Sequence, residues 1–456
     1  MAGACLLTSV TSAVGFGSLM SAHLPIIRGF GGYTAIGIML AFAGTMLFVP
    51  VALSKLSLPT RAPESNPVEK FGSRVTEFFV SAVTIHRGAS IAVVMLTVVV
   101  ALVGASRVVP DSHLMEELDA ANPVAISNAV LEANHGGVLS GALVFNGERG
   151  AFSDPEALRA LERVAQRAED WRTEDGRTLV SNAFCLSDLV KEAHAEYRGD
   201  ESFRAVPSTP AAVMSLLDQV GAEDRASLVS ADYGVTHLTF RMYSVGSRAW
   251  SSLRAELEAA VDAEPSLSQT DWYFTGSSTL GQDAMGFMTR DLITSLGLAT
   301  IIIMILMTIL FRSLRLGLIS MVPNLFPLLI TLGVVGYLGI NLRVSTAVVF
   351  SISLGIAVDD TIHVLVRFRE ELAKAGRTYE EALLAAMRGA GRGVVFTTII
   401  LCAGFGTLTF SEFSAVHELG VLGGVTLFAA LVGDLLVLPL VLLVLGPSKR
   451  VSRSLS

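Results

Sequence analysis

Eight apolar runs, each about as long as a bilayer is thick, divide this 456-residue chain. A helix needs about 20 consecutive apolar residues to cross the hydrocarbon core. The overall composition agrees with a membrane protein, with 52% hydrophobic and 16% charged residues. The predicted spans are residues 4–21, 33–54, 89–107, 292–311, 316–339, 344–366, 394–411 and 420–445.

Basic residues in the loops orient these spans. They gather before the third span, between the fourth and fifth, between the sixth and seventh, and after the last. The positive-inside rule places these loops in the cytoplasm. Residues 108–290 are therefore expected on the extracytoplasmic (periplasmic) side of the inner (plasma) membrane. This insert has about twice as many acidic as basic residues, which disfavours a nucleic-acid partner. No basic region follows Met1, so we expect no cleavable signal peptide.

The external insert reads as a mixed α/β domain. β-forming residues predict strands, and apolar residues at helical spacing predict helices between them. Their order favours a ferredoxin-like split β-α-β unit with a mainly helical insertion at about 185–225. The strands are expected at 138–145, 178–182, 233–243 and 271–275, and the helices at 155–169, 210–220 and 248–261.

The fold class is therefore an α-helical polytopic membrane protein with one extracytoplasmic α/β domain. Apolar residues lie on one side of segment 370–390, which predicts an amphipathic helix on the cytoplasmic face. The expected parts are two spans at 1–54, a cytoplasmic linker at 55–88, a span at 89–107, the α/β domain at 108–290, a five-helix bundle at 291–446 and a cytoplasmic tail at 447–456.

An internal repeat relates the two ends of the chain. Gly15-Phe16-Gly17 recurs 389 residues later as Gly404-Phe405-Gly406, and Pro50 recurs at the same spacing as Pro439. Both copies leave the cytoplasm and return, which is the parallel type of repeat found in transporters. At that spacing, the counterpart of Asp359 would fall before Met1. We therefore expect the chain to pair with a missing N-terminal half or with a second copy of itself.

Two adjacent acids, Asp359 and Asp360, interrupt the sixth apolar run. A charged side chain at the centre of a membrane helix costs about 2.5–3.5 kcal/mol or more, so such acids mark proton or ion pathways. The alternative is that they mark a helix end. Acids at a helix C-terminus oppose the dipole, however, and apolar residues follow this pair. A proton relay is the favoured interpretation.

Each of the other polar residues in the spans has a functional and a structural interpretation. His363 lies three and four residues after the acids and could accept a proton or simply hydrogen-bond at the interface. Asp434 could be a second protonatable group or a structural hydrogen-bonding residue. Thr397 and Thr398 could bond the acidic pair or their own helix carbonyls.

Small and kink-forming residues complete the set of candidates. Gly355, Gly404 and Gly406 are expected to permit close helix packing. Pro327, together with Asn324, is expected to kink the fifth span.

No motif indicates an enzyme. The three cysteines, Cys5, Cys185 and Cys402, form no metal-ligand cluster with histidines, and no nucleophile triad or cofactor motif is present. We therefore expect no metal, no cofactor and no catalytic activity.

Four motifs carry a family resemblance. They are Gly-Ile-Ala-Val-Asp-Asp-Thr-Ile-His at 355–363, Val-Pro-Asn-Leu-Phe-Pro at 322–327, Thr-Thr at 397–398 followed by Gly-Phe-Gly at 404–406, and Gly-Asp-Leu-Leu-Val-Leu-Pro at 433–439. The chain resembles the C-terminal half of a resistance-nodulation-division (RND) exporter, in the branch that overlaps the mycobacterial-membrane-protein-large (MMPL) and sterol-sensing-domain groups. The resemblance covers nearly the whole chain. It implies that this chain supplies the fifth to twelfth spans of such an exporter.

That resemblance implies export of a hydrophobic or amphiphilic, lipid-like molecule driven by the proton-motive force, with Asp359 and Asp360 as the relay. Membrane lipids, cargo and protons are the implied partners. The alternative is a non-transporting module that senses lipid or sterol or assists assembly, or an inactive fragment.

Overall fold

The computed structural model describes residues 2–22, 25–55, 67–108, 111, 122–342, 344–374 and 376–445. The tail predicted at 447–456 and the first part of the 55–88 linker lie outside these residues. The chain divides into two compact units, Met1–Pro110 with Phe287–Ser456, and Asp111–Gly286. Each unit is built around its own hydrophobic core.

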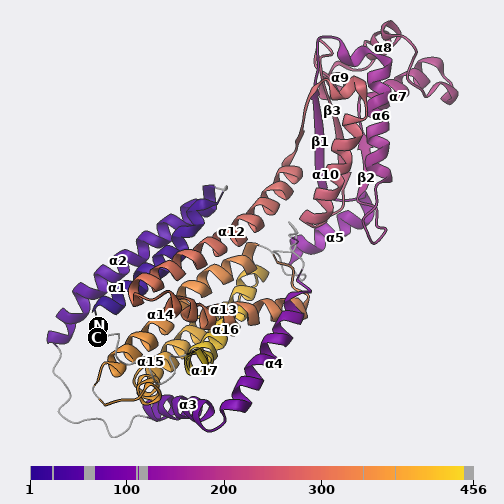
Figure 1. The fold of residues 1–456 in the computed structure, drawn as a ribbon. Coiled ribbons are helices and arrows are strands. Elements are labelled where there is room, and N and C mark those ends of the chain that lie inside the picture. The colour runs from indigo at the N-terminus through magenta and orange to yellow at the C-terminus, as the bar shows by residue number, and fades with distance from the viewer. Residues whose placement is uncertain are drawn as a thin grey trace. The chain divides into compact units, whose positions relative to one another are not determined.

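The second unit is a four-stranded antiparallel sheet covered by helices (Figure 1). Its strand order, β2-β3-β1-β4, is that of a ferredoxin-like split β-α-β unit, as predicted. The strands are β1 Leu139–Asn146, β2 Val180–Phe184, β3 Val235–Met242 and β4 Asp271–Thr275. The helices are α5 Pro123–His135, η2 Ala151–Ser153, α6 Pro155–Asp170, α7 Leu186–Arg198, η3 Glu201–Phe203, α8 Pro210–Leu217, α9 Ala222–Leu228, α10 Ser247–Asp262 and α11 Pro265–Ser268.

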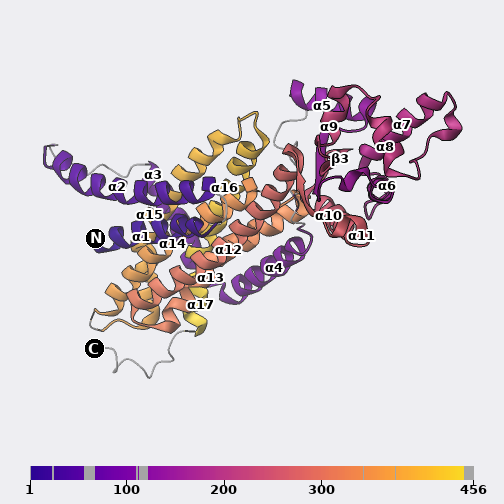
Figure 2. The same cartoon turned by 90° about the horizontal axis from the view of Figure 1, so that it is seen from above.

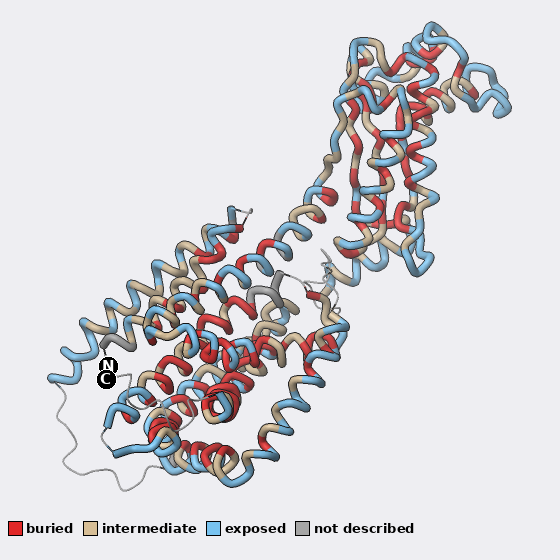
Figure 3. Tube along the Cα trace, in the orientation of Figure 1, coloured by how far each residue is buried: buried red, intermediate tan, exposed pale blue. Residues whose placement is uncertain are grey.

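Alternation of side chains along the strands explains why one face of this sheet is covered. Leu139, Leu143 and Phe145 of β1 are buried, and so are Leu238 and Phe240 of the paired strand β3. They pack with the apolar face of α6 to form the core, which appears as the red segments of Figure 3. The helices α7 to α9 form the insertion that was expected between the second and third strands.

The first unit is a bundle of long apolar helices. Within the part of the chain that the structure describes, seven are long and apolar enough to cross a membrane. The first predicted span, residues 4–21, corresponds to a shorter apolar segment, Cys5–Ser21, which is made by α1 and the turn η1. The helices are α1 Ala2–Gly17, η1 Ser18–Ser21, α2 Pro25–Lys55, α3 Pro67–Thr84, α4 Arg87–Ala105, α12 Ser277–Phe311, α13 Leu314–Leu338, α14 Val344–Leu372, α15 Tyr379–Leu408, α16 Ser414–Val432, η4 Gly433–Val437 and α17 Leu438–Leu445.

The amphipathic helix predicted at 370–390 is not a separate element. Its first residues end α14, and its last residues are the start of α15, which continues without a break to Leu408. An amphipathic helix does occur in the linker, where none was predicted. This is α3, whose Thr76 contacts Gly391 of α15, and whose Glu77 pairs with Arg388 at 2.8 Å.

The internal repeat is visible in helix packing. The helices α1 and α2 lie side by side, as Figure 1 and Figure 2 show, and α15 packs in the same way on α16. A Cβ added to Gly31 would lie 2.6 Å from the Phe16 carbonyl oxygen. A Cβ added to Gly420 would lie 2.8 Å from the equivalent Phe405 oxygen. Both copies therefore depend on a glycine at the same close helix crossing.

Candidate functional site

The acidic pair lies in the interior of helix α14. Val358 and Ile362, on either side of it, are fully buried, whereas Asp359 and Asp360 are each half-buried. Successive residues of an α-helix point about 100° apart. The two carboxylates consequently meet different neighbouring helices.

Asp359 faces α1. The Ser12 hydroxyl lies 3.4 Å from Asp359 Oδ1 and 3.2 Å from the Gly355 carbonyl oxygen, so it can donate to either. Small residues allow this approach, because a Cβ added to Gly15 would lie 3.6 Å from the Gly355 Cα. Gly355 thus permits the helix contact that was expected of it. The first acid is reached by a hydroxyl from the other end of the chain.

Asp360 faces α15. The Thr397 hydroxyl lies 3.3 Å from Asp360 Oδ1 and 2.9 Å from the carbonyl oxygen of Val394 in its own helix. Its neighbour Thr398 bonds only that carbonyl, at 2.8 Å. Of the two threonines considered from sequence, the structure therefore brings Thr397 to the acidic pair and leaves Thr398 bonded to the backbone.

His363 is half-buried one turn beyond the acids. Among the residues that the structure describes, it makes no hydrogen bond or ion pair with either carboxylate. Its predicted role as a proton acceptor stays a prediction. Spacing on a helix places side chains on one face but does not make them touch.

Asp434 joins the site indirectly. It lies in η4, the π-helical turn between α16 and α17, and contacts the hydroxyl of Thr361, the residue after Asp360. Thr361 also lies 3.1 Å from Asn324 Oδ1 of α13. Thr361 was not among the residues predicted from sequence. A signal existed, since Asn324, Thr361 and Asp434 are polar residues within apolar runs.

Two of the predicted packing glycines have no close neighbour. A Cβ added to Gly404 or Gly406 would meet no atom within 4 Å, so the close packing expected there is not seen. The tight contacts are made by Gly420 and Gly423, which approach the backbone and ring of Phe405. Pro327 lies inside α13 without ending that helix.

The chemistry open to the pair is limited by its neighbours. Among the described residues, no lysine or arginine forms an ion pair with either carboxylate, and no cluster of three metal-ligating side chains occurs. Hydroxyl groups can donate one hydrogen bond each but cannot neutralise a charge. Burial and a neighbouring negative charge both favour the protonated form of a carboxylic acid. This arrangement suits binding and release of protons.

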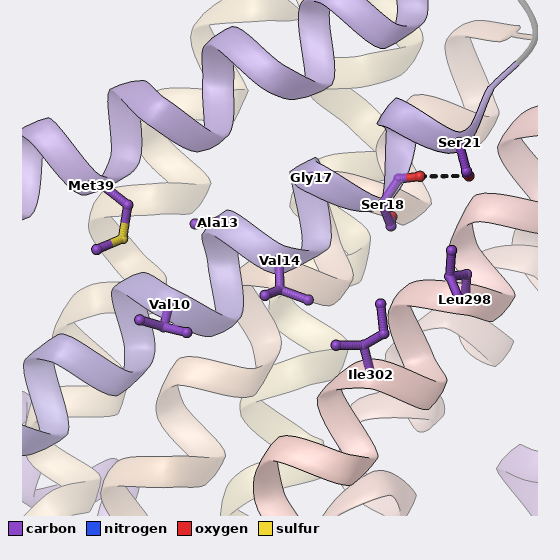
Figure 4. A pocket seen from close by; sticks show the side chains of 9 residues that line it. All are labelled: Val10, Ala13, Val14, Gly17, Ser18, Ser21, Met39, Leu298 and Ile302. Carbon is purple, nitrogen blue, oxygen red and sulfur yellow. Dashed lines mark hydrogen bonds between the residues drawn. The ribbon is translucent and has the colours of Figure 1, made fainter.

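A separate groove of about 370 Å³ opens between α1, α2 and α12 (Figure 4). Its walls are mostly apolar, and the Ser21 hydroxyl donates to the Ser18 carbonyl oxygen at 2.7 Å near one end. Neither acid lines it. The lining residues are Val10, Ala13, Val14, Gly17, Ser18, Ser21, Met39, Leu298 and Ile302.

Comparison with known proteins gives three kinds of match. The model of the MMPL family matches residues 151–455. The membrane protein MJ1562 of Methanocaldococcus jannaschii is 24% identical over 270 residues, which are 59% of this chain and 65% of that protein. The mycolic acid-containing lipids exporter MmpL11 of Mycolicibacterium smegmatis is 29% identical over 146 residues, which are 31% of this chain and 15% of the exporter.

A solved structure shares the fold. The hedgehog release protein Disp from the water bear Hypsibius dujardini superposes with a TM-score of 0.66 at 14% identity, covering 98% of this chain and 58% of that one. This chain therefore spans less than two-thirds of the length of each of these relatives.

Proposed function

We propose, starting from the fact that this chain belongs to the MMPL family, that it is part of a transporter that uses proton movement through Asp359 and Asp360 to export a lipid-like molecule. Lipid-like transport is supported at the level of the family, because one relative is a lipid exporter. Proton coupling and the direction of transport belong to the proposal. So does the location in the inner (plasma) membrane, with the α/β unit outside.

One observation carries the proposal. Two half-buried carboxylates in an apolar helix have hydroxyl partners from two other helices, and no cation pairs with them among the described residues. With both acids charged, the buried negative charge would be uncompensated. With a proton bound, that charge falls and the helices can pack more closely. Proton binding therefore changes the preferred packing of α1, α14 and α15, which couples it to movement.

The test is neutral replacement of each acid. We expect Asp359→Asn and Asp360→Asn, each in the complete transporter, to reduce proton-driven lipid efflux to the rate of cells without the protein. Membrane insertion should be unchanged, because asparagine is similar in shape and less costly to bury. The matched control is Asp262→Asn on the exposed end of α10, which should transport normally.

Efflux at the wild-type rate from both neutral variants would exclude the relay. It would favour the alternative of a lipid- or sterol-sensing module, which does not need the acids to titrate.

A pairing partner is a further part of the proposal. The acidic helix has no repeat counterpart in this chain, whereas α15 and α16 are matched by α1 and α2. We expect a complementary set of spans, from a further segment or a second copy, to complete the bundle. Cargo movement by a reconstituted monomer of this chain alone would contradict the pairing.

A further inference from the structure

Three elements each contribute one polar side chain to a buried polar node. The node consists of Asn324 of α13, Thr361 of α14 and Asp434 of η4. Asn324 and Thr361 are 0% exposed and Asp434 is 1% exposed. The proton relay just proposed does not use this node, although Thr361 directly follows Asp360.

Counting hydrogens assigns the direction of each bond in the node. The Asn324 amide nitrogen lies 2.7 Å from the Ser320 carbonyl oxygen, which can only accept. The amide oxygen must therefore face Thr361. The Thr361 hydroxyl then lies between two oxygens, Asn324 Oδ1 and Asp434 Oδ1, with one hydrogen to give. A second hydrogen is needed, and a carboxylic acid at Asp434 supplies it.

The resulting chain of bonds runs in one direction. Protonated Asp434 donates to Thr361, Thr361 donates to Asn324, and Asn324 donates to the Ser320 carbonyl oxygen. The Thr361 hydroxyl, the Asn324 amide oxygen and Asp434 Oδ1 then each take part in a bond with matched donor and acceptor. An ionised Asp434 would leave Asn324 Oδ1 or itself without a donor, which is unfavourable at full burial.

The backbone holds Asp434 in this place. Pro327 has no N–H, so the Pro323 carbonyl oxygen has no helical partner. Gly433 packs against that oxygen, to which an added Cβ would come within 2.7 Å. The π-helical turn that begins at Gly433 then directs the next residue, Asp434, toward α14. Such turns are frequent at functional sites.

The node has no counterpart in the first repeat. The position equivalent to Asp434 is Thr45, in α2, which is α-helical throughout and exposes this residue. The Thr45 hydroxyl bonds its own Ala41 carbonyl oxygen at 2.8 Å. Asp434 is therefore an addition to the repeated scaffold and is not required for its packing.

The ionisable groups around Asp434 leave Asp360 as its charged neighbour. The π-helical turn contacts α3, α13, α14, α16 and α17, and Asp360 is the group whose charge acts on Asp434. On α3, Glu69 and Glu77 pair with arginines of α15. Lys70 and Arg74 of α3 are exposed, and no ionisable side chain occurs in α17. The remaining ionisable residues of α13, α14 and α16 are Arg315, Tyr337, Asp359, His363, Arg367, Arg369, Glu370, Glu371, His417 and Glu418.

We propose that Asp434 keeps its proton throughout the transport cycle and acts as a positioning residue for Asp360 through Thr361. A neutral Asp434 adds no third negative charge beside the pair, so the pair can titrate without it. It also fixes the turn of α14 that carries Asp360 against α13 and η4. The protonation state stands on its own, whereas the positioning role rests on the proposed function.

The protonation state can be measured without transport. In infrared spectra of the whole chain in lipid nanodiscs, we expect a protonated-carboxyl band that persists from mildly acidic to mildly alkaline pH. Asp434→Asn should remove this band and leave the bands that titrate. A spectrum of Asp434→Asn that retains the pH-independent band would overturn the assignment.

Transport separates a positioning residue from a proton carrier. An asparagine can still donate to Thr361, so Asp434→Asn should transport within about twofold of the wild-type rate. Asp434→Leu should lose at least about tenfold, since the chain of bonds is broken. Thr361→Val, of the same shape as threonine, should lose a similar amount if Asp434→Leu fails to fold.

If Asp434→Asn transports as poorly as Asp360→Asn, Asp434 is a proton carrier and the proposal is wrong. If Thr361→Val transports normally, Asp434 does not position Asp360 through Thr361. If Asp434→Asn removes the pH-independent infrared band but no variant transports lipid, wild type included, only the proposed function is rejected.

Discussion

At the scale of single residues, the two acids of α14 differ in their partners although they are adjacent in sequence. Asp359 meets Ser12 of α1, and Asp360 meets Thr397 of α15. The pair therefore joins the first and second copies of the repeat. A change in the charge of one acid acts on a different helix from a change in the other.

The adjacent threonines of α15 offer a matched pair of variants. Thr397→Val removes the hydroxyl that reaches Asp360, and should lower proton-driven efflux about three- to tenfold, since one hydrogen bond contributes about 0.5–1.5 kcal/mol. Thr398→Val removes a bond to the helix backbone only and should transport normally. Efflux should be compared at equal surface expression. Equal losses in both variants would show that the contact with Asp360 is unimportant.

Sequence could identify the acids but not all of their partners. An acidic pair inside an apolar run is conspicuous, because burial is so costly there. Thr397 and Thr398 were indistinguishable, since both can bond a helix carbonyl and only packing decides which one faces α14. Thr361 escaped notice because a threonine in a helix is ordinary.

At the scale of elements, α12 is tied firmly into the α/β unit at its start. The Trp250 indole of α10 donates to Asp283 Oδ1 at 2.9 Å, and Arg254 of α10 pairs with the other oxygen of Asp283. Arg254 also lies over the ring of Phe274, 4.9 Å from its centre. One carboxylate of α12 thus holds two side chains of α10.

We predict that Asp283→Ala lowers the free energy of unfolding of the α/β unit by about 1–3 kcal/mol, because it leaves the Trp250 N–H and Arg254 without their acceptor. Tryptophan fluorescence during heating of the purified chain measures this. Asp283→Asn should lose less, since its amide oxygen can still accept from Trp250. The exposed Asp262→Ala on α10 is the control. Identical melting of Asp283→Ala and wild type would contradict the role of this contact.

The elements that sequence predicted well share a simple pattern. Strands with alternating burial and helices that begin with Asp-Pro or Thr-Pro were placed to within a few residues. The linker helix α3 was missed because polar residues occur in each of its turns. Segment 370–390 was assigned to one helix because its apolar spacing continues from the end of α14 at Leu372 to the start of α15 at Tyr379, and a helical pattern does not reveal that boundary.

At the scale of the whole molecule, the family predicted from the motifs and the membrane fold predicted from the apolar runs are confirmed. Among the described residues, seven helices are long and apolar enough to cross a membrane, and Cys5–Ser21 is a shorter apolar segment in the place of the first predicted span. Which side of the membrane each loop occupies is a prediction from charge alone, and it needs a direct test.

A probe of topology should use introduced cysteines. Burial raises the pKa of the Cys185 thiol to about 12, so this residue remains a protonated, unreactive thiol at neutral pH. After replacement of the native cysteines, Ala231→Cys in the α/β unit should react with an impermeant thiol reagent in intact cells. Ala373→Cys, exposed between α14 and α15, should react only after lysis. The reverse pattern would invert the proposed orientation.

The length of α15 has a mechanical consequence. Its 30 residues span about 45 Å, whereas the hydrocarbon core is about 30 Å thick, so part of the helix projects from the membrane. Thr397 lies about 27 Å along the axis from Tyr379, and a tilt of roughly 10° about Thr397 would displace that end by about 5 Å. The helix is thus a lever whose fulcrum is the contact with Asp360. Its long arm packs against α3, so a small rotation of α15 about this contact would move α3 at the far surface.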